Sequence, residues 1–350
     1  MQRKKVTVAD IAKELDLSWV TVDRVLNNRG GVSEKTKQRV LEMVEKLGYT
    51  ANRAAKHLAK KTKCTIGVSY SLPDWFREQI DRGINKAYYE LKDFGANVMI
   101  RVAPKSAEEQ IAQIREMLPE IDALAVTPWE PSIFSNFLDE LVDGGLPVAT
   151  FNIDVPGSKR LFYIGCSYLE SGRLCGELIT KLVHRPGKVA VVTNKNYLTH
   201  LEQRITGFRE VLSRKKEMKI IGPLKIDEYD PSSAAAIKQC VEDNPDLAAI
   251  YHVCTNMELS ANVIKETGNA GRIKLVGFDV NDRYHQLIME DVIQAVVCQE
   301  PFDQGYFPIK ILFEFVAEGR WPATTEVLTP LEIIMRENLK YFYNYQHPIG

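Results

Sequence analysis

The chain of 350 residues is long enough for a small domain and a large one, each with its own core. Its formal net charge is only −1, but residues 1–63 hold 15 Lys and Arg against 7 Asp and Glu, a net of +8, while the remainder holds 30 against 39, a net of −9. A basic segment on an acidic body is typical of a protein that binds a polyanion. The sequence shows neither a signal-peptide stretch nor a run near the roughly 20 apolar residues of a membrane span, so we exclude a membrane protein and expect a cytoplasmic one.

Two short helical patterns near the N-terminus follow one another almost directly. Apolar residues recur at three- and four-residue intervals after Thr7 and again after Ser18, and either hydroxyl can cap the first turn of a helix. Only residues 15–17 separate the two patterns, so the second helix must turn sharply across the first. This is the spacing of a helix-turn-helix.

A third pattern, capped by Ser33, supplies the apolar residues that close a small core around the first two helices. Residues 51–63 then predict a short hinge helix that begins at Asn52 and carries Leu58 on a small apolar face beside basic residues such as Arg53. Isolated helices of fewer than about 12–15 residues are marginal in water, so we expect this one to form only against a second copy or DNA.

The second helix presents residues suited to the major groove of DNA. Arg24 can bind guanine in a bidentate manner, and Trp19 or Val20 can press on a thymine methyl group. Thr21 and Asp23 share this outward side. An ordinary solvated face is the alternative interpretation, but it seldom explains an exposed tryptophan.

From residue 65 the pattern changes to short apolar runs that alternate with helical stretches. Continuous runs of Val, Ile and Ala indicate strands buried on both faces, and therefore parallel sheets covered by helices. The sequence thus predicts an α/β body of two doubly wound lobes. The predicted strands are 65–70, 96–102, 122–128 and 146–153 in one series and 188–193, 219–224, 247–253, 273–279 and 293–299 in a second.

Polar and aromatic side chains follow these strands, where ligands of such sheets bind. Carboxylates, amides, an arginine and flat rings suit a sugar, whose hydroxyls need donors and acceptors while its C–H face stacks on a ring. Each residue could instead be structural, since a capping Asp or a tryptophan at the edge of the core is more common. The candidate effector-binding residues are Asp74, Trp75, Phe76, Trp129, Asn152, Asp154, Arg204, Asn256, Asp279 and Gln299.

The first 60 residues resemble the headpiece and hinge of the lactose-repressor (LacI) family. The resemblance rests on "VTVADIAKELDLSWVTVDRVLN" and "VSEKTKQRVLEMVEKLGYTANRAAKHLAKK". It implies that Leu58 wedges into the minor groove of DNA. The chain departs from the family at two positions: Asp23 stands where relatives often have a hydroxyl residue, and Ala51 stands where they often have a proline. The implied base-reading residues are Trp19, Val20 and Arg24, and residues that contact phosphate or steady the motif are Thr7, Thr21 and Asn27, to which we add the hinge residues Asn52 and Arg53.

The body is similar to type I periplasmic sugar-binding proteins, the effector domain of the same family. "VGFDVND", "AVVCQEPFDQG" and "LEQRITGF" carry the resemblance, which implies that Asp279, Gln299 and Arg204 contact a sugar. It also implies that Trp75 and Phe76 stack on that sugar. Asn152 is followed by isoleucine where ribose and galactose binders usually have Asp-Arg, which argues against plain ribose or galactose.

Together these features predict a transcriptional regulator, by default a repressor. We expect a DNA-binding head in residues 1–50, a hinge helix and linker in 51–63, and an effector-binding and dimerisation domain in 64–345. A homodimer would bind a pseudo-palindromic operator, and a small sugar-like effector between the lobes would control its affinity for DNA. A solute-binding protein of a transport system is the alternative, but it has no use for a head of charge +8.

An enzyme is not expected. No predicted strand is followed by a Gly-x-Gly-x-x-Gly motif, no P-loop occurs, and no Ser-His-Asp or paired-carboxylate set can be argued. The six cysteines show no Cys-x-x-Cys pair and no zinc-ligand spacing, so we expect free thiols and neither a metal nor a cofactor.

Overall fold

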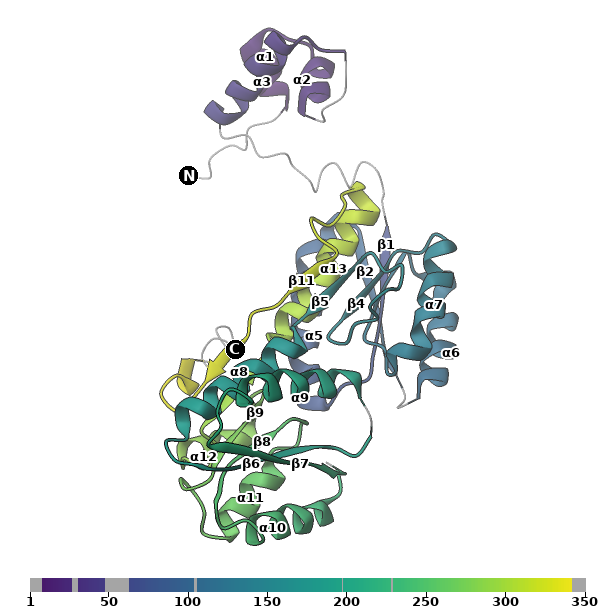
Figure 1. Ribbon diagram of the computed structural model, residues 1–350. Helices are drawn as coiled ribbons and strands as arrows, with labels where there is room; N and C mark the ends of the chain where they lie inside the picture. The colour runs from purple at the N-terminus through teal and green to yellow at the C-terminus, as the bar shows by residue number, and fades with distance from the viewer. Residues whose placement is uncertain are drawn as a thin grey trace. The chain divides into compact units, whose positions relative to one another are not determined.

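The computed structural model describes residues 8–26, 31–47, 63–103, 106–196, 198–227 and 229–341 (Figure 1). The chain divides between Thr62 and Lys63 into two units, a helical head and a larger body. Three helices form the head: α1 (Val8–Leu15), α2 (Trp19–Leu26) and α3 (Glu34–Leu47).

A tight turn joins α1 to α2. Asp16 has a φ of 53°, a left-handed conformation that Asp tolerates better than most residues with a side chain. The backbone N–H of Leu17 donates to the carbonyl of Ala12 at 2.9 Å, which satisfies one of the free acceptors at the end of α1. The Ser18 hydroxyl then accepts from the N–H of Thr21 at 3.1 Å, so the predicted N-cap of the second helix is confirmed.

All three helices of the head contribute to one core. Ile11, Val22 and Val40, one from each helix, are completely buried. Ser33 caps α3 as predicted, because its hydroxyl accepts from the N–H of Thr36 at 3.3 Å. The residues packed around this centre are Ala12, Leu15, Leu17, Val25, Leu26, Val32, Met43, Val44 and Leu47.

Lobe 1 of the body is a six-stranded parallel sheet with the order β2-β1-β3-β4-β5-β11. Strands β3, β4 and β5 are buried along their whole length, as the continuous apolar runs predict for β3 and β4. In Figure 1, α5 and α13 cover one face of this sheet and α6 and α7 cover the other. The bounds are β1 Cys64–Tyr70, β2 Ala96–Val102, β3 Ala123–Val126, β4 Val148–Phe151, β5 Phe162–Gly165 and β11 Glu326–Leu328, with α5 Asp74–Leu91, α6 Ala107–Met117, α7 Pro131–Asp143 and α13 Pro301–Glu318.

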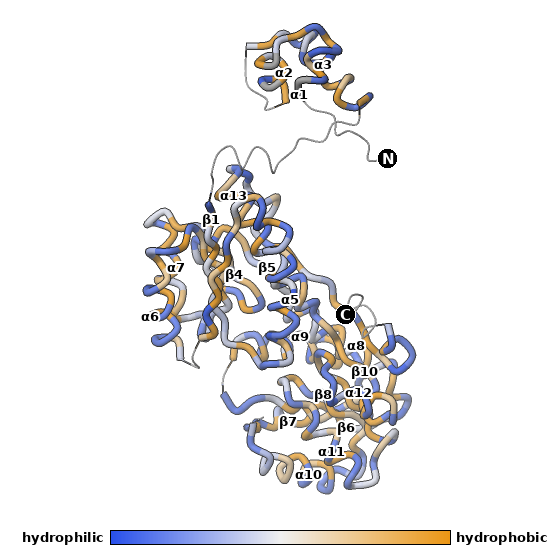
Figure 2. Tube along the Cα trace, turned by 180° about the vertical axis from the view of Figure 1, so that it is seen from behind, coloured by the Kyte–Doolittle hydropathy of each residue, from blue (hydrophilic) through white to orange (hydrophobic). Residues whose placement is uncertain are grey.

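Lobe 2 repeats this plan with the strand order β7-β6-β8-β9-β10-β12, in which only β12 is antiparallel to its neighbour. Figure 2 shows orange, hydrophobic residues along strands such as β4, β8 and β10. The bounds are β6 Gly187–Asn194, β7 Met218–Ile226, β8 Leu247–His252, β9 Lys274–Phe278, β10 Ala295–Cys298 and β12 Glu332–Ile334, with α8 Tyr168–Leu182, α9 Thr199–Leu212, α10 Ala234–Glu242, α11 Glu258–Glu266 and α12 Asp282–Met289; short 3-10 turns are η1 Lys92–Phe94, η2 Leu118–Glu120 and η3 Pro231–Ser233.

The two predicted lobes and their parallel sheets are confirmed, and every predicted strand is present. The sequence patterns do not predict β5, β11 and β12. Strands β11 and β12 have only three residues each, which is too short for a periodicity to show. None of the helices that the structure describes has the length and apolar character needed to cross a membrane.

The chain passes between the lobes three times, after β5, after β10 and between β11 and β12. Hydrogen bonds tie the three passages together. Thr329 donates its backbone N–H to the carbonyl of Gly165 at 2.9 Å and its hydroxyl to the carbonyl of Gln299 at 3.0 Å. The Cys166 thiol donates to Oε1 of Gln299 at 3.2 Å.

Glycines bring two helices into backbone contact in lobe 2. A Cβ at Gly172 on α8 would lie 1.9 Å from the carbonyl oxygen of Arg204 on α9. A Cβ at Gly207 on α9 would lie 2.0 Å from the carbonyl oxygen of Leu169 on α8. Any side chain at either position would therefore push the helices apart, and with them the backbone that carries Arg204.

Lobe 1 has the same arrangement. A Cβ at Gly305 on α13 would lie 2.1 Å from the carbonyl oxygen of Ile80 on α5, and one at Gly83 would lie 2.0 Å from that of Phe302. In lobe 2, the entering helix α8 thus packs closely against α9, which follows the first strand of that lobe. In lobe 1, the entering helix α13 packs in the same way against α5.

Candidate functional site

The outward side of α2 is the candidate DNA-reading surface of the head. Val20 is 52% exposed, Arg24 is exposed and Thr21 is half-buried. An exposed valine beside an exposed arginine matches the expected base-reading surface, since the inward residues Val22 and Val25 are buried in the core.

Several predicted DNA-binding residues lie outside the described part of the chain. They are Thr7, Asn27, Asn52, Arg53 and Leu58, together with the side chains of Trp19 and Asp23. The predicted hinge helix in residues 51–63 also falls there, except for its last residue.

In the body, four of the predicted effector residues come together where the strands of the two lobes end. Asn152 follows β4 and Asp279 follows β9, and both have left-handed φ values, 60° and 58°. Asn and Asp are the non-glycine residues that adopt this conformation most readily. Gln299 follows β10, Arg204 lies on α9, and all four side chains are buried.

Gln299 connects the members of this cluster. Its Nε2 donates to Oδ2 of Asp279 at 2.8 Å, and its Oε1 accepts from the thiol of Cys166. Gln304, at the start of α13, donates to the carbonyl of Gln299 at 2.5 Å and accepts from Nδ2 of Asn152 at 3.0 Å. A chain of hydrogen bonds therefore runs from lobe 1 to the carboxylate of lobe 2.

Arg204 is a buried cation held by aromatic rings. Its guanidinium lies 3.4 Å from the ring centroid of Phe278 and 5.0 Å from that of Tyr168, a cation–π geometry. Its Nη1 donates to the carbonyl of Val253 at 3.3 Å. Among the residues that the structure describes, no group accepts from its Nε or Nη2.

Asp279 has a corresponding free acceptor. Burial raises the pKa of its carboxyl from the ordinary 3.8 to about 6, although Arg204 and the hydrogen bonds from Gln299 act in the opposite direction. Oδ1 of Asp279 is buried and has no partner in the described part of the chain. Unpaired buried polar atoms are costly, so two donor atoms of Arg204 and one acceptor of Asp279 are positioned to bind hydroxyl groups of a ligand.

Asp74 and Asp154 make structural ion pairs instead. Asp74 is exposed at the start of α5 and pairs with Arg77 at 3.1 Å. Asp154 pairs with Arg160 at 2.5 Å, and its Oδ1 accepts from the hydroxyl of Thr150 at 2.7 Å. Neither contact joins them to the cluster around Gln299, so their role toward an effector stays a prediction.

The remaining predicted residues lie in the first turn of α5 or in the loops that follow β3 and β8. Phe76 is buried and packs edge-on against the ring of Trp75, with centroids 5.6 Å apart. Trp129 is partly buried against the core of lobe 1, and its backbone N–H donates to Oε1 of Gln110 at 2.9 Å. Asn256 is half-buried in the loop after β8.

Sequence reasoning missed four residues of the cluster: Cys166, Tyr168, Gln304 and Thr329. Cys166 and Tyr168 follow β5, which the sequence patterns do not predict, and Thr329 follows β11, which is equally short. Tyr168 donates its hydroxyl to the carbonyl of Asn152 at 2.9 Å. Gln304 is fully buried, and it lies within "CQEPFDQG", the segment that carries the resemblance at Gln299, so that segment was a usable signal.

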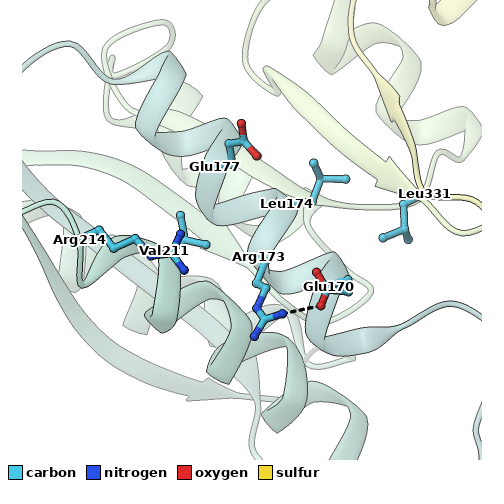
Figure 3. A pocket seen from close by; sticks show the side chains of 7 residues that line it. All are labelled: Glu170, Arg173, Leu174, Glu177, Val211, Arg214 and Leu331. Atoms are coloured by element: carbon cyan, nitrogen blue, oxygen red, sulfur yellow. Dashed lines mark hydrogen bonds and ion pairs between the residues drawn. The ribbon is translucent and has the colours of Figure 1, made fainter.

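A separate surface groove of about 730 Å³ runs along α8 and α9 (Figure 3). Its charged residues are partly paired with one another, as Arg173 is with Glu170 at 2.5 Å. No group of three or more potential metal ligands occurs among the described residues. The groove is lined by Glu170, Arg173, Leu174, Glu177, Val211, Arg214 and Leu331, and none of the clustered effector candidates contributes to it.

Comparison with known proteins assigns both parts of the chain. Residues 7–52 match the model for bacterial regulatory proteins of the lacI family, and residues 66–320 match that for a periplasmic binding protein domain. The chain is similar to catabolite control protein A of Priestia megaterium, with 23% identity over 89% of this chain and 92% of that protein. It is also similar to the ribose operon repressor of Halalkalibacterium halodurans, with 21% identity over 95% and 97% of the two chains.

A solved structure shares the fold of the body. The sugar-binding protein of a sugar ABC transporter from Bacillus halodurans superimposes with a TM-score of 0.72 at 23% identity, covering 80% of this chain and 100% of that one. The periplasmic-binding body is thus shared with transport proteins, while the helix-turn-helix head is not explained by transport. The chain thus joins the DNA-binding domain of lacI-family bacterial regulatory proteins to a body that belongs to the periplasmic binding protein domain family, and it is a DNA-binding transcriptional regulator.

Proposed function

We propose that the protein is a repressor that binds a pseudo-palindromic operator as a homodimer and releases it when a sugar or sugar derivative binds between the lobes of the body. The observation that carries the proposal is the buried set of Arg204 and Asp279, whose unpaired donor and acceptor atoms lie where the strands end. The exposed face of α2 supplies the other half of the function.

The DNA contacts divide into two groups by their expected role. Val20, Arg24 and Trp19 read base edges, because the outward side of a recognition helix enters the major groove. Thr7, Thr21 and Asn27 hold phosphates or steady the motif, and Leu58 wedges into the minor groove at the centre of the operator. Such a reader of chromosomal DNA works in the bacterial cytoplasm.

The dimer is supported by an exposed strand edge in lobe 1. Strand β2 is at the edge of its sheet, and Val98, Met99 and Ile100 are only partly buried there, while Val102 is 48% exposed. Partly apolar edge strands are usually covered in native proteins. A second copy of lobe 1 provides such a cover and gives the two-fold symmetry that a palindromic operator requires.

The effector is of the sugar class because the free atoms match hydroxyl chemistry. Arg204 offers two N–H donors and Asp279 one acceptor, while the rings of Tyr168 and Phe278 are already next to Arg204. Relatives of this chain include a protein named as a ribose operon repressor, and a structural neighbour is a sugar-binding protein. The departure at Asn152 and the following isoleucine favours a sugar derivative other than ribose or galactose.

Effector and operator binding are coupled through the arrangement of the lobes. A ligand shifts the equilibrium only by the difference between its affinities for the two arrangements. A sugar held by residues at the ends of β4, β9 and β10 contacts both lobes, so its binding favours one lobe angle. The paired hinge segments then separate or approach, and the affinity for operator DNA changes.

The first experiment is a thermal-shift screen of the full-length protein with D-ribose, D-xylose, L-arabinose, D-galactose, D-glucuronate, D-glucosamine and sorbitol. A sugar at 100 times its Kd stabilises the folded state by about 2.7 kcal/mol. Asp279→Ala should lose this response but keep operator binding. The matched control is Asp246→Ala, which removes an exposed carboxylate of the same lobe that pairs with Lys188.

The result that contradicts the effector proposal is an equal response in Asp279→Ala and the unaltered protein. Loss of operator binding in Asp279→Ala would show instead that this residue is needed for folding.

Base reading is tested by Arg24→Ala, with Lys35→Ala on α3 as an exposed basic control. If Arg24 binds guanine, the variant should lose about 1–3 kcal/mol of discrimination between the operator and an operator with that base changed. Fluorescence anisotropy with both duplexes at one salt concentration measures it. An equal loss on both duplexes means that Arg24 contacts phosphate only.

A further inference from the structure

Gln299 lies on the second passage between the lobes, and both its backbone carbonyl and its side-chain amide make hydrogen bonds. Its carbonyl accepts from the Gln304 side chain and from the Thr329 hydroxyl, which belongs to the third passage. Its side chain accepts from the Cys166 thiol, which belongs to the first passage, and donates to Asp279. The three passages therefore meet at one residue, whose side chain also contacts the effector candidate Asp279.

The Gln299 amide is held at both ends, by the Asp279 carboxylate and by the Cys166 thiol. An ionised carboxylate only accepts hydrogen bonds, so Nε2 must face Asp279. The opposite end of the amide then presents Oε1, which needs a donor, and the thiol supplies its S–H at 3.2 Å. Burial raises the pKa of the Cys166 thiol to about 11, so the thiol keeps this proton at neutral pH.

This orientation decides what Asp279 can offer. With Oδ2 engaged by Gln299, the carboxylate faces the remaining space with Oδ1 alone, beside the unpaired donors of Arg204. A reversed amide would set the oxygen of Gln299 against the carboxylate, and the repulsion would turn Asp279 away from that position.

We propose that Cys166 is a positioning residue of the effector site, which holds the Gln299 amide so that Asp279 keeps one oxygen directed at the effector. The inference rests on the proposed function, because it assigns a role within the same site.

The test follows the titration of Asp279 without any sugar. The full-length protein is labelled with ¹³C at the aspartate carboxyls, and Asp279→Asn identifies the signal. The other titratable or charged groups that act on Asp279 or are acted on by it are Arg204 on α9, Cys166 and Tyr168 at the first passage, Cys175 on α8, Tyr284 on α12, and Cys298 and Glu300 beside Gln299.

Cys166→Ala removes the donor, weakens the bond from Gln299 to the carboxylate and should raise the pKa of Asp279 by about one pH unit. Cys166→Val, which fills the space without a donor, should do the same if the alanine variant does not fold. Cys166→Ser keeps a donor and should restore the original titration. The matched control is Cys64→Ala, which changes a different buried cysteine, in β1, and should leave the pKa of Asp279 unchanged.

An Asp279 that titrates as in the unaltered protein in folded Cys166→Ala or Cys166→Val overturns the inference, as does a serine variant that fails to restore it. These outcomes are distinct from failure of the proposed function. A protein that binds no sugar in the screen but shows the expected shifts contradicts the function alone. One that binds a sugar without any shift in Cys166→Ala contradicts the positioning role alone.

Discussion

In lobe 1 the chain leaves the fourth strand at Asn152, and in lobe 2 it leaves the corresponding strand at Asp279, with φ values of 60° and 58°. The glycine contacts extend this correspondence. Ile80 meets Gly305 by its carbonyl just as Arg204 meets Gly172, so isoleucine and arginine occupy equivalent positions. The next pair is Cys166 after β5 and Gln299 after β10.

The two lobes thus share a backbone framework but differ in charge at equivalent points. Lobe 2 carries a cation and a carboxylate where lobe 1 carries isoleucine and an amide. Backbone contacts that exclude a Cβ are maintained in both lobes, so they serve the packing of the fold. The charges occur once, so they serve a role that packing does not need. In the proposed effector site, lobe 2 therefore supplies the charged groups and lobe 1 the neutral ones.

The correspondence between the two lobes is tested most directly at the glycines that bring their helices into contact. Gly172→Ala and Gly305→Ala each place a Cβ about 2 Å from a backbone oxygen and should destabilise the protein by about 3 kcal/mol or more. Urea denaturation measures this loss. Only Gly172→Ala also displaces the backbone of Arg204, so it should abolish a sugar response at temperatures where both variants are folded. Equal retention of the response in both variants would show that the position of Arg204 does not depend on this contact.

A change at Asp279 makes lobe 2 resemble lobe 1. The folded pKa of about 6 lies above the ordinary 3.8, so the stability from this carboxyl is fully present below about pH 4 and is lost as the pH rises through about 6. The rise corresponds to about 3 kcal/mol at most. Asp279→Asn should therefore become more stable than the unaltered protein as the pH increases from 4 to 7. Parallel Tm profiles of the two proteins over this range would contradict the raised pKa.

The smallest effect is expected in lobe 1. Asn152→Ala removes a hydrogen bond to Gln304 and a residue that tolerates a left-handed φ, which together should cost about 1–2 kcal/mol at any pH. Because no charge is involved, the loss measured by urea denaturation should be the same at pH 5 and pH 8. A loss that varies with pH would show that lobe 1 also contributes to the electrostatics of the site.

Most of the fold was predictable because its strands are buried on both faces and read as continuous apolar runs. The head was predictable for another reason, since Ser18, Ser33 and the short spacing between helices are local signals. The three-residue strands β11 and β12 gave no such signal, because their pairing depends on strands far away in the chain.

A residue of the candidate site was predictable where the strand next to it was predicted. Asp279 and Gln299 follow long predicted runs, and the structure brings them into contact. Cys166 and Thr329 follow unpredicted strands, so their place beside Gln299 could not be foreseen. Asp154 shows the opposite case: it lies at a strand end, but the sequence alone does not reveal that Arg160 is its partner.

The three passages between the lobes have a consequence for synthesis on the ribosome. Lobe 1 begins with β1 but contains α13 and β11, which are translated only after β10 of lobe 2. Helix α13 contacts β1, β3, β4 and β5, so the face of the first sheet that it shares with α5 stays partly uncovered while the intervening residues emerge. The five parallel strands of lobe 2 are therefore complete before lobe 1 is, although lobe 1 is begun first.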